Sequence, residues 1–292
     1  MTTVGVGIGF AFIAMLCWGF GDFLIQRSTR KLGDWETLFL ITGFGTVALL
    51  PFAWRSFIEL FIGDPTALIV LMIAAAILLG SSLLDFEALR KGKLAIVEPI
   101  WSFEIVSASL LGFFILGERI SWLAGGVIAL LMSGLVLVAF REKRLTSKIL
   151  LEKGVAIALI AALAMGCANF FLGWGGRESD PILANFFVNA FMAIGTGVYL
   201  IAHVSWRKPF RDLREHGRLL VPMMISDNVA WVAYAFSMSL APIAIATALS
   251  ESYIIVTVLL GLAVNKERLQ RHQKAGLIIA IAAAIALALI AS

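Results

Sequence analysis

Ionisable and aromatic side chains recur at helical spacing inside apolar stretches of this 292-residue chain. Trp18 and Asp22 lie about one helical turn apart, and Asp227, Trp231 and Tyr234 also share one helical face. An ionisable side chain within an apolar span is costly, normally faces the interior of a helix bundle, and marks a functional site. Carboxylates beside aromatic rings could pair with an ammonium group while the rings bury an apolar body.

Matching polar faces occur in further apolar stretches. Glu98, Trp101 and Ser102 share a face, and residues 149 positions later, among them Ser250 and Glu251, repeat it. None of the three histidines has a partner at metal-ligand spacing, so we expect no metal site, no cofactor and no catalytic residues. The candidate substrate-binding residues are Trp18, Asp22, Ser82, Asp85, Glu98, Pro99, Trp101, Ser102, Met165, Asn169, Asp227, Trp231, Tyr234, Ser250 and Glu251.

The chemistry of this set suits two classes of ligand. A zwitterionic amino acid could place its ammonium group on the carboxylates and its carboxylate on Asn169, Ser102 or Ser250. A lipophilic cation would use the carboxylates and aromatic rings alone. Core packing is the alternative for the deep tryptophans, and pairing with neighbouring Arg or Lys is the alternative for Asp22 and Asp85 near the span ends.

The elements that position these residues are apolar helices. The chain is 61% hydrophobic and only 14% charged, whereas soluble domains average about 45–50% apolar and roughly 25% charged residues. This composition excludes a soluble enzyme and a nucleic-acid-binding protein and predicts an all-α integral membrane protein. Ten transmembrane helices are expected, at 4–26, 36–54, 66–89, 94–116, 122–140, 154–173, 181–202, 219–240, 243–264 and 275–291.

Basic residues predict the orientation of these spans. Of the 23 Lys and Arg residues, all but Arg55, Arg119 and Arg177 fall on one side of the predicted topology. Because short cytoplasmic loops carry the excess of positive charge, we expect a multi-pass protein of the cytoplasmic (inner) membrane with both termini outside the cytoplasm.

The chain contains an internal repeat. Residues 95–104, which lead to Glu118, correspond to residues 244–253, which lead to Glu267, at a constant offset of 149. Since each half holds five spans, an odd number, the second half must begin on the opposite side of the membrane. We therefore expect two inverted five-helix repeats, at 1–145 and 146–292.

The five-plus-five layout, with a Gly-Glu-Arg turn at 117–119 and a Lys-Glu-Arg turn at 266–268 after the fourth span of each half, resembles the EamA family of the drug/metabolite transporter superfamily. Lys266 stands where that family usually has Gly. Within it, the chain looks most like the YddG-type aromatic amino acid exporters. The resemblance implies secondary export of small metabolites through a central cavity lined by spans one, three, four, six, eight and nine.

These observations predict an amino acid exporter that works by alternating access around a midplane cavity. Multidrug or lipophilic-cation efflux is the alternative, and an integral-membrane transferase or a channel is a weaker one. No nucleotide-binding loop occurs, so we expect no ATP hydrolysis by this chain and no nucleic-acid partner. The expected partners are the substrate, membrane lipid and protons, which Asp22, Glu98 and Glu251 could carry.

Overall fold

The computed structural model describes residues 2–63, 65–91, 100–139, 153–264 and 269–291, without the side chains of 22–23, 25–31, 86–91 and 153–154. Every regular element in these ranges is a helix. The helices are α1 (Thr3–Leu32), α2 (Asp34–Leu60), α3 (Pro65–Lys91), α5 (Glu104–Ile115), α6 (Trp122–Ala139), α8 (Lys153–Glu178), α9 (Pro181–His203), α10 (Lys208–Leu240), α11 (Ile243–Ser250), α12 (Tyr253–Val264) and α13 (Arg271–Ala291).

The predicted all-α class is confirmed for the described residues, and their apolar helices are compatible with a membrane protein. Within the described ranges, nine segments are long and apolar enough to cross a membrane, and α5 is a shorter apolar helix. Residues 94–99 of the predicted span 94–116 lie outside the described residues, so only residues 100–116, which include α5, can be compared. Helix α10 begins at Lys208 rather than 219 and is kinked at His216, where φ is −121° and ψ is 21°.

The predicted span 243–264 consists of two helices, α11 and α12, separated by Glu251 and Ser252. At this break the N–H groups of Ser252 and Ile255 donate to carbonyls three residues earlier, at 3.2 and 2.9 Å. Such i−3 bonds tighten the backbone and interrupt the α-helical ladder. The same bonds occur 149 residues earlier, around Phe103, so both halves are interrupted at equivalent positions.

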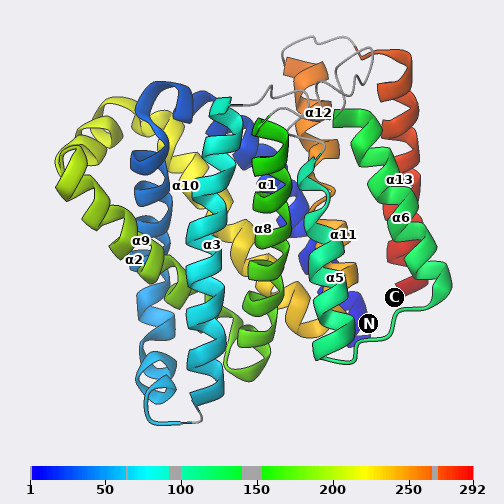
Figure 1. Cartoon of the computed structure of the whole chain (residues 1–292), viewed down its shortest axis with the longest axis horizontal. Helices are drawn as coiled ribbons and strands as arrows, with labels where there is room; N and C mark the ends of the chain where they lie inside the picture. The colour runs from blue at the N-terminus through cyan, green and yellow to red at the C-terminus, as the bar shows by residue number, and fades with distance from the viewer. Residues whose placement is uncertain (1, 64, 92–99, 140–152, 265–268, 292) are drawn as a thin grey trace.

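Helices of the first half pack against helices of the second. The most extensive contacts join α3 to α8, α1 to α10, α6 to α13 and α2 to α9. Figure 1 shows α2 and α9 on one side of the bundle and α6 and α13 on the other, with α3, α8, α5 and α11 between them. Both termini lie at the same end of the bundle. The interior is therefore built from both halves together.

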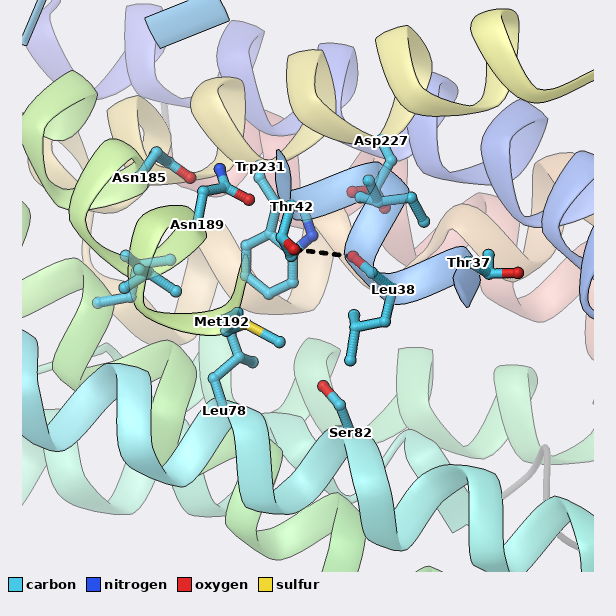
Figure 2. A pocket seen from close by; sticks show the side chains of 13 residues that line it. Thr37, Leu38, Thr42, Leu78, Ser82, Asn185, Asn189, Met192, Asp227 and Trp231 are labelled. Atoms are coloured by element: carbon cyan, nitrogen blue, oxygen red, sulfur yellow. Dashed lines mark hydrogen bonds between the residues drawn. The ribbon is translucent and has the colours of Figure 1, made fainter. Parts of the chain in front are cut away.

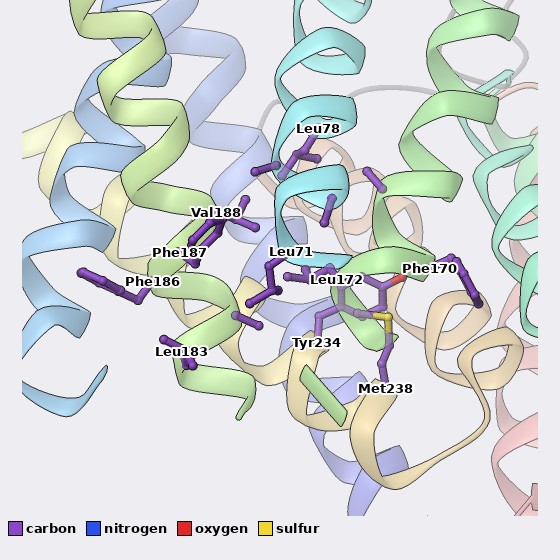
Figure 3. Packing of buried hydrophobic residues seen from close by; sticks show 14 of the residues in the cluster. Leu71, Leu78, Phe170, Leu172, Leu183, Phe186, Phe187, Val188, Tyr234 and Met238 are labelled. Carbon is purple, nitrogen blue, oxygen red and sulfur yellow. The ribbon is translucent and has the colours of Figure 1, made fainter. Parts of the chain in front are cut away.

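Large apolar side chains fill the space between α3, α8, α9 and α10 (Figure 3). Leu71, Phe170 and Met238 are fully buried there. Gly175 of α8 lies against Leu71, and a Cβ at this position would approach the Leu71 Cγ to 2.9 Å. The absence of a side chain at 175 thus allows α3 and α8 to pack closely, as small residues do in membrane helix pairs.

A partly buried ionic cluster joins the helices at the end of the bundle where both termini lie. The Glu118 carboxylate, just after α5, is 2.6 Å from the Arg177 guanidinium of α8. It also accepts a 2.8 Å hydrogen bond from the N–H of Ile243, the first residue of α11. Arg177 donates in turn to the carbonyls of Met238 and Ala241, at 2.7 and 2.9 Å. The cluster therefore ties α5, α8, α10 and α11 together.

We expect Glu118→Gln to destabilise the protein, because it leaves the Arg177 guanidinium without a carboxylate. Hydrogen bonds to charged groups contribute about 1.5–3 kcal/mol each, so the apparent Tm in detergent should fall by roughly 5 °C. Arg55→Gln is the matched control, since it removes an ion pair with Glu59 whose side chains are 91% and 64% exposed. That control should shift the Tm by less than about 1 °C. Equal shifts in the two variants would contradict a structural role for the cluster.

Candidate functional site

Polar side chains from five helices meet in the interior of the bundle. They are Asp85 of α3, Glu104 of α5, Asn169 of α8, Tyr234 of α10 and Glu251 at the end of α11, and we call this set the polar centre. All but Asp85 are buried. Glu104 lies within the electrostatic influence of Glu251 and Asp85, and Glu251 within that of Asp85. Three carboxyl groups gathered in a medium of low dielectric could act as counter-charge to a bound cation.

The hydrogen bonds of the polar centre leave several polar atoms unsatisfied. Asn169 Nδ2 donates to Glu104 Oε2 at 3.2 Å, and the Tyr234 hydroxyl shares a 2.7 Å hydrogen bond with Thr247 Oγ1. Asp85 Oδ1, Asn169 Oδ1 and the indole Nε1 of Trp101 are buried and have no hydrogen-bond partner among the described residues. The Trp101 indole lies next to Asp85, so these two groups face each other, whereas Asn169 Oδ1 is a buried acceptor that remains available to a ligand or water.

The helix breaks place two of the carboxyl groups. Glu104 is the first residue of α5, directly after the break around Phe103, and Glu251 is the C-cap residue that directly follows α11. Gly166 of α8 faces the first break, where a Cβ would overlap the Glu104 carbonyl oxygen and the Ser107 hydroxyl. Glycine at 166 thus lets α8 approach the backbone of α5 and brings Asn169, one turn later, to the Glu104 carboxyl.

An aromatic cluster adjoins the polar centre. The Trp18 ring of α1 lies edge-on to Trp231 and Tyr234, with both centroid distances 5.1 Å, and 6.2 Å from Tyr253. Edge-to-face contacts between aromatic rings are favourable and hold their planes at defined angles. Since Tyr234 belongs to both groups, the cluster supplies an apolar wall beside buried carboxyls.

A cavity of about 170 Å³, which we call the side cavity, lies between α2, α3, α9 and α10 (Figure 2). It lies beside the aromatic cluster, because Trp231 belongs to both. Ser82 of α3 is one turn from Asp85, which places the cavity close to the polar centre. Its lining residues are Thr37, Leu38, Ile41, Thr42, Leu78, Ser82, Leu172, Asn185, Val188, Asn189, Met192, Asp227 and Trp231.

The structure distributes the sequence-predicted residues over these three groups. Asp85, Asn169, Tyr234 and Glu251 meet in the polar centre, and the Trp101 indole lies next to Asp85. Trp18 joins the aromatic cluster, whereas Ser82, Asp227 and Trp231 line the side cavity.

Three predicted residues take part in other contacts. Ser250 is fully buried, and its hydroxyl donates to the Ala11 carbonyl of α1 at 3.5 Å, which is a contact between helices. Met165 Sδ accepts from the Ser81 hydroxyl at 3.6 Å, and Ser102 is buried at the break before α5. The predicted site residues Glu98 and Pro99, and the side chain of Asp22, lie outside the part of the chain that the structure describes.

Sequence reasoning missed several residues of the site. Glu104 is a carboxylic acid inside the predicted span 94–116, and the rule that selected Glu98 would have selected it too. The contributions of Thr42 and Asn189 from α2 and α9 were also missed. Threonine and asparagine commonly hold membrane helices together, so their presence alone carried no signal for a cavity.

Comparison with known proteins decides the family. The sequence profile of the EamA-like transporter family matches residues 5–140 and, a second time, residues 152–289. The chain belongs to the EamA-like transporter family. As an EamA-like transporter it is a multi-pass membrane protein that moves small molecules, and not an enzyme.

The fold has a solved relative. A structure described only as "Crystal structure of protein" superposes with a TM-score of 0.78 at 14% sequence identity, over 98% of this EamA-like transporter and 97% of that chain. At this identity the likeness concerns the fold alone. Comparison with curated protein sequences gives no significant match.

We expect Gly166→Ala to disturb the polar centre, because the added methyl group would push the backbone at Glu104 away from α8. Overpacking of this kind costs about 1–3 kcal/mol, so the apparent Tm in detergent should fall by several degrees. Gly126→Ala is the matched control, since no atom lies within 4 Å of a Cβ at that position. Alanine favours the helix by roughly 0.5–1 kcal/mol over glycine, so the control should keep or raise the Tm. A Tm for Gly166→Ala at or above the wild type would contradict the close contact.

Proposed function

We propose that this EamA-like transporter exports amino acids with aromatic or other apolar side chains across the cytoplasmic membrane. The observation that carries the proposal is the placement of an aromatic wall, Trp18 with Trp231 and Tyr234, beside the buried carboxyls of Glu104 and Glu251. A carboxyl group pairs with a substrate ammonium, and rings bury an apolar side chain. The resemblance to YddG-type exporters supports the same substrate class.

Alternating access between two inverted repeats, 1–145 and 146–292, is the proposed mechanism. The packing of the helices supports it. Exchanging the halves maps the pair α1–α10 onto α8–α3 and leaves the pairs α2–α9 and α6–α13 unchanged, as a two-fold relation requires. Transporters of this kind bind substrate near the midplane between the repeats, and both chain termini would then lie outside the cytoplasm.

Efflux of lipophilic cations is the second candidate. Asp85, Glu104 and Glu251 act on one another in the interior, and Asp227 is the charged residue of the side cavity. A cation would compensate these carboxylates without needing a partner for a substrate carboxylate. Protons are the proposed exchange ion in either case, with Glu251 as the described candidate carrier.

Flux into proteoliposomes of the purified full chain tests the function. Labelled Trp, Phe, Met and Thr are compared with tetraphenylphosphonium, with and without a pH gradient. We expect saturable amino acid flux that Trp18→Ala lowers by at least about tenfold, because the ring anchors the aromatic wall. Trp122→Ala is the control, since Trp122 is 99% exposed at the start of α6.

The outcomes separate the candidates. Flux of the cation alone would replace amino acid export by cation efflux, and flux of neither compound would overturn the proposed function. Glu251→Gln should abolish the response to the pH gradient if this carboxyl carries the exchanged proton. An unchanged response would exclude Glu251 as the carrier. The apparent Tm of each variant, measured beside its flux, distinguishes loss of function from loss of folding.

A further inference from the structure

The side cavity presents an excess of hydrogen-bond acceptors. Thr42 Oγ1 donates to the Leu38 carbonyl at 2.8 Å, as Figure 2 shows, and Thr37 Oγ1 donates to the Gly33 carbonyl at 2.8 Å. A hydroxyl has one proton and two lone pairs. Because both protons are already bound to the helix backbone, these threonines can offer a ligand only lone pairs.

Hydrogen bonds between side-chain amides orient Asn189 so that it, too, offers the cavity an acceptor. Both N–H groups of Asn228 donate to backbone carbonyls, those of Ile41 and Met224, at 3.1 and 2.9 Å. The Asn228 oxygen must then be an acceptor, and Asn189 Nδ2 donates to it at 3.3 Å. The orientation of Asn189 follows from this network, and its Oδ1 remains an acceptor.

Asn185 and Asp227 complete the acceptor set. Asn185 Nδ2 donates to the Pro181 carbonyl at 2.8 Å, which leaves its Oδ1 as an acceptor. Asp227 supplies a carboxylate, and none of the described residues that line the cavity is Lys, Arg or His. The donors that remain among the described lining residues are the Ser82 hydroxyl, the Trp231 indole N–H and the second N–H of each asparagine. The lining therefore complements a cation with several N–H donors better than an anion.

The apolar part of the lining limits the size of the ligand. Leu78, Leu172, Val188 and Met192 form walls with Trp231. A dry cavity of about 150 Å³ accommodates benzene, so about 170 Å³ accommodates one ring with a short chain. The indole face of Trp231 also attracts a cation placed over it.

We propose that the side cavity binds small primary ammonium compounds with a single-ring apolar body, with Asp227 as counter-ion and Thr42 and Asn189 as acceptors. The inference rests on the proposed function, and it deepens that function by naming a second subsite and the substrate group that it selects. The ammonium group, rather than the carboxylate, is the feature that this subsite recognises, whether it belongs to an amine or to an amino acid.

Three probes that share a phenylethyl unit test the selection. Phenethylamine carries only the ammonium group, phenylalanine carries both charges, and 3-phenylpropionate carries only the carboxylate. Isothermal titration into the purified full chain in detergent, corrected by titration into detergent alone, should show phenethylamine binding at least about tenfold more tightly than 3-phenylpropionate. Equal affinities, or tighter binding of the acid, would overturn the proposal.

Variants locate the binding. Asp227→Asn should weaken phenethylamine binding by at least about tenfold, because it removes the counter-ion. Asp212→Asn is the control, a buried carboxylate on the same helix that does not line the cavity. Thr42→Val should weaken binding about threefold or more. Thr46→Val should not, since Thr46 makes the same 2.8 Å bond to its own helix one turn away and does not line the cavity.

Two further outcomes are decisive. If Asp227→Asn and Thr42→Val keep wild-type affinity while Glu104→Gln loses it, the ligand binds in the polar centre and the side-cavity proposal fails. If phenethylamine binds and Asp227→Asn abolishes this, but no compound crosses the proteoliposome membrane, the subsite stands and the proposed transport function fails. The apparent Tm of each variant shows that a loss of affinity is not a loss of folding.

Discussion

The constraint on which this structure depends is that a hydrocarbon environment offers no water to a polar group. Several hydroxyl side chains within the described helices donate to the backbone of their own helix, as at Thr37, Thr42 and Thr196. The helix breaks obey the same constraint, since the backbone at Ser252 continues with i−3 bonds instead of free N–H groups. Glu118 and Arg177 satisfy carbonyl and N–H groups at the ends of α10 and α11.

This constraint also decides the chemistry of the interior. Side-chain protons that are bound to the backbone leave oxygen lone pairs facing the cavity, so the lining becomes rich in acceptors. The carboxyl groups of the polar centre are also hydrogen-bond acceptors. Among them, Asp85 Oδ1 is buried without a geometric hydrogen-bond partner among the described residues, as is Asn169 Oδ1. Under the proposals made above, polar centre and side cavity would both complement a ligand that donates hydrogen bonds and carries positive charge.

Family membership shows the class of protein, and the geometry shows which groups could form its binding site. The two profile matches show that the chain is an EamA-like transporter of small molecules. The geometry adds what that membership does not supply, namely which buried groups adjoin one another. Trp231 links the side cavity to the aromatic cluster, and Tyr234 links that cluster to Glu104 and Glu251. A ligand that moves between these groups would meet aromatic surface and acceptors throughout.

The sequence by itself determined the class of protein and nearly all of the helices. Apolar length and charge distribution decide what crosses a membrane, and both are local properties of the chain. Helical spacing also placed Asp85, Asn169, Tyr234 and Glu251 on inward faces, where they meet. Only the tertiary structure decided that 243–264 breaks at Glu251, that Asn169 bonds to Glu104, and that α2 and α9 help to enclose a cavity. These features depend on how closely helices from the two halves approach, at Gly166 for example, and on which protons the backbone already holds. Neither is encoded in the period of a single helix.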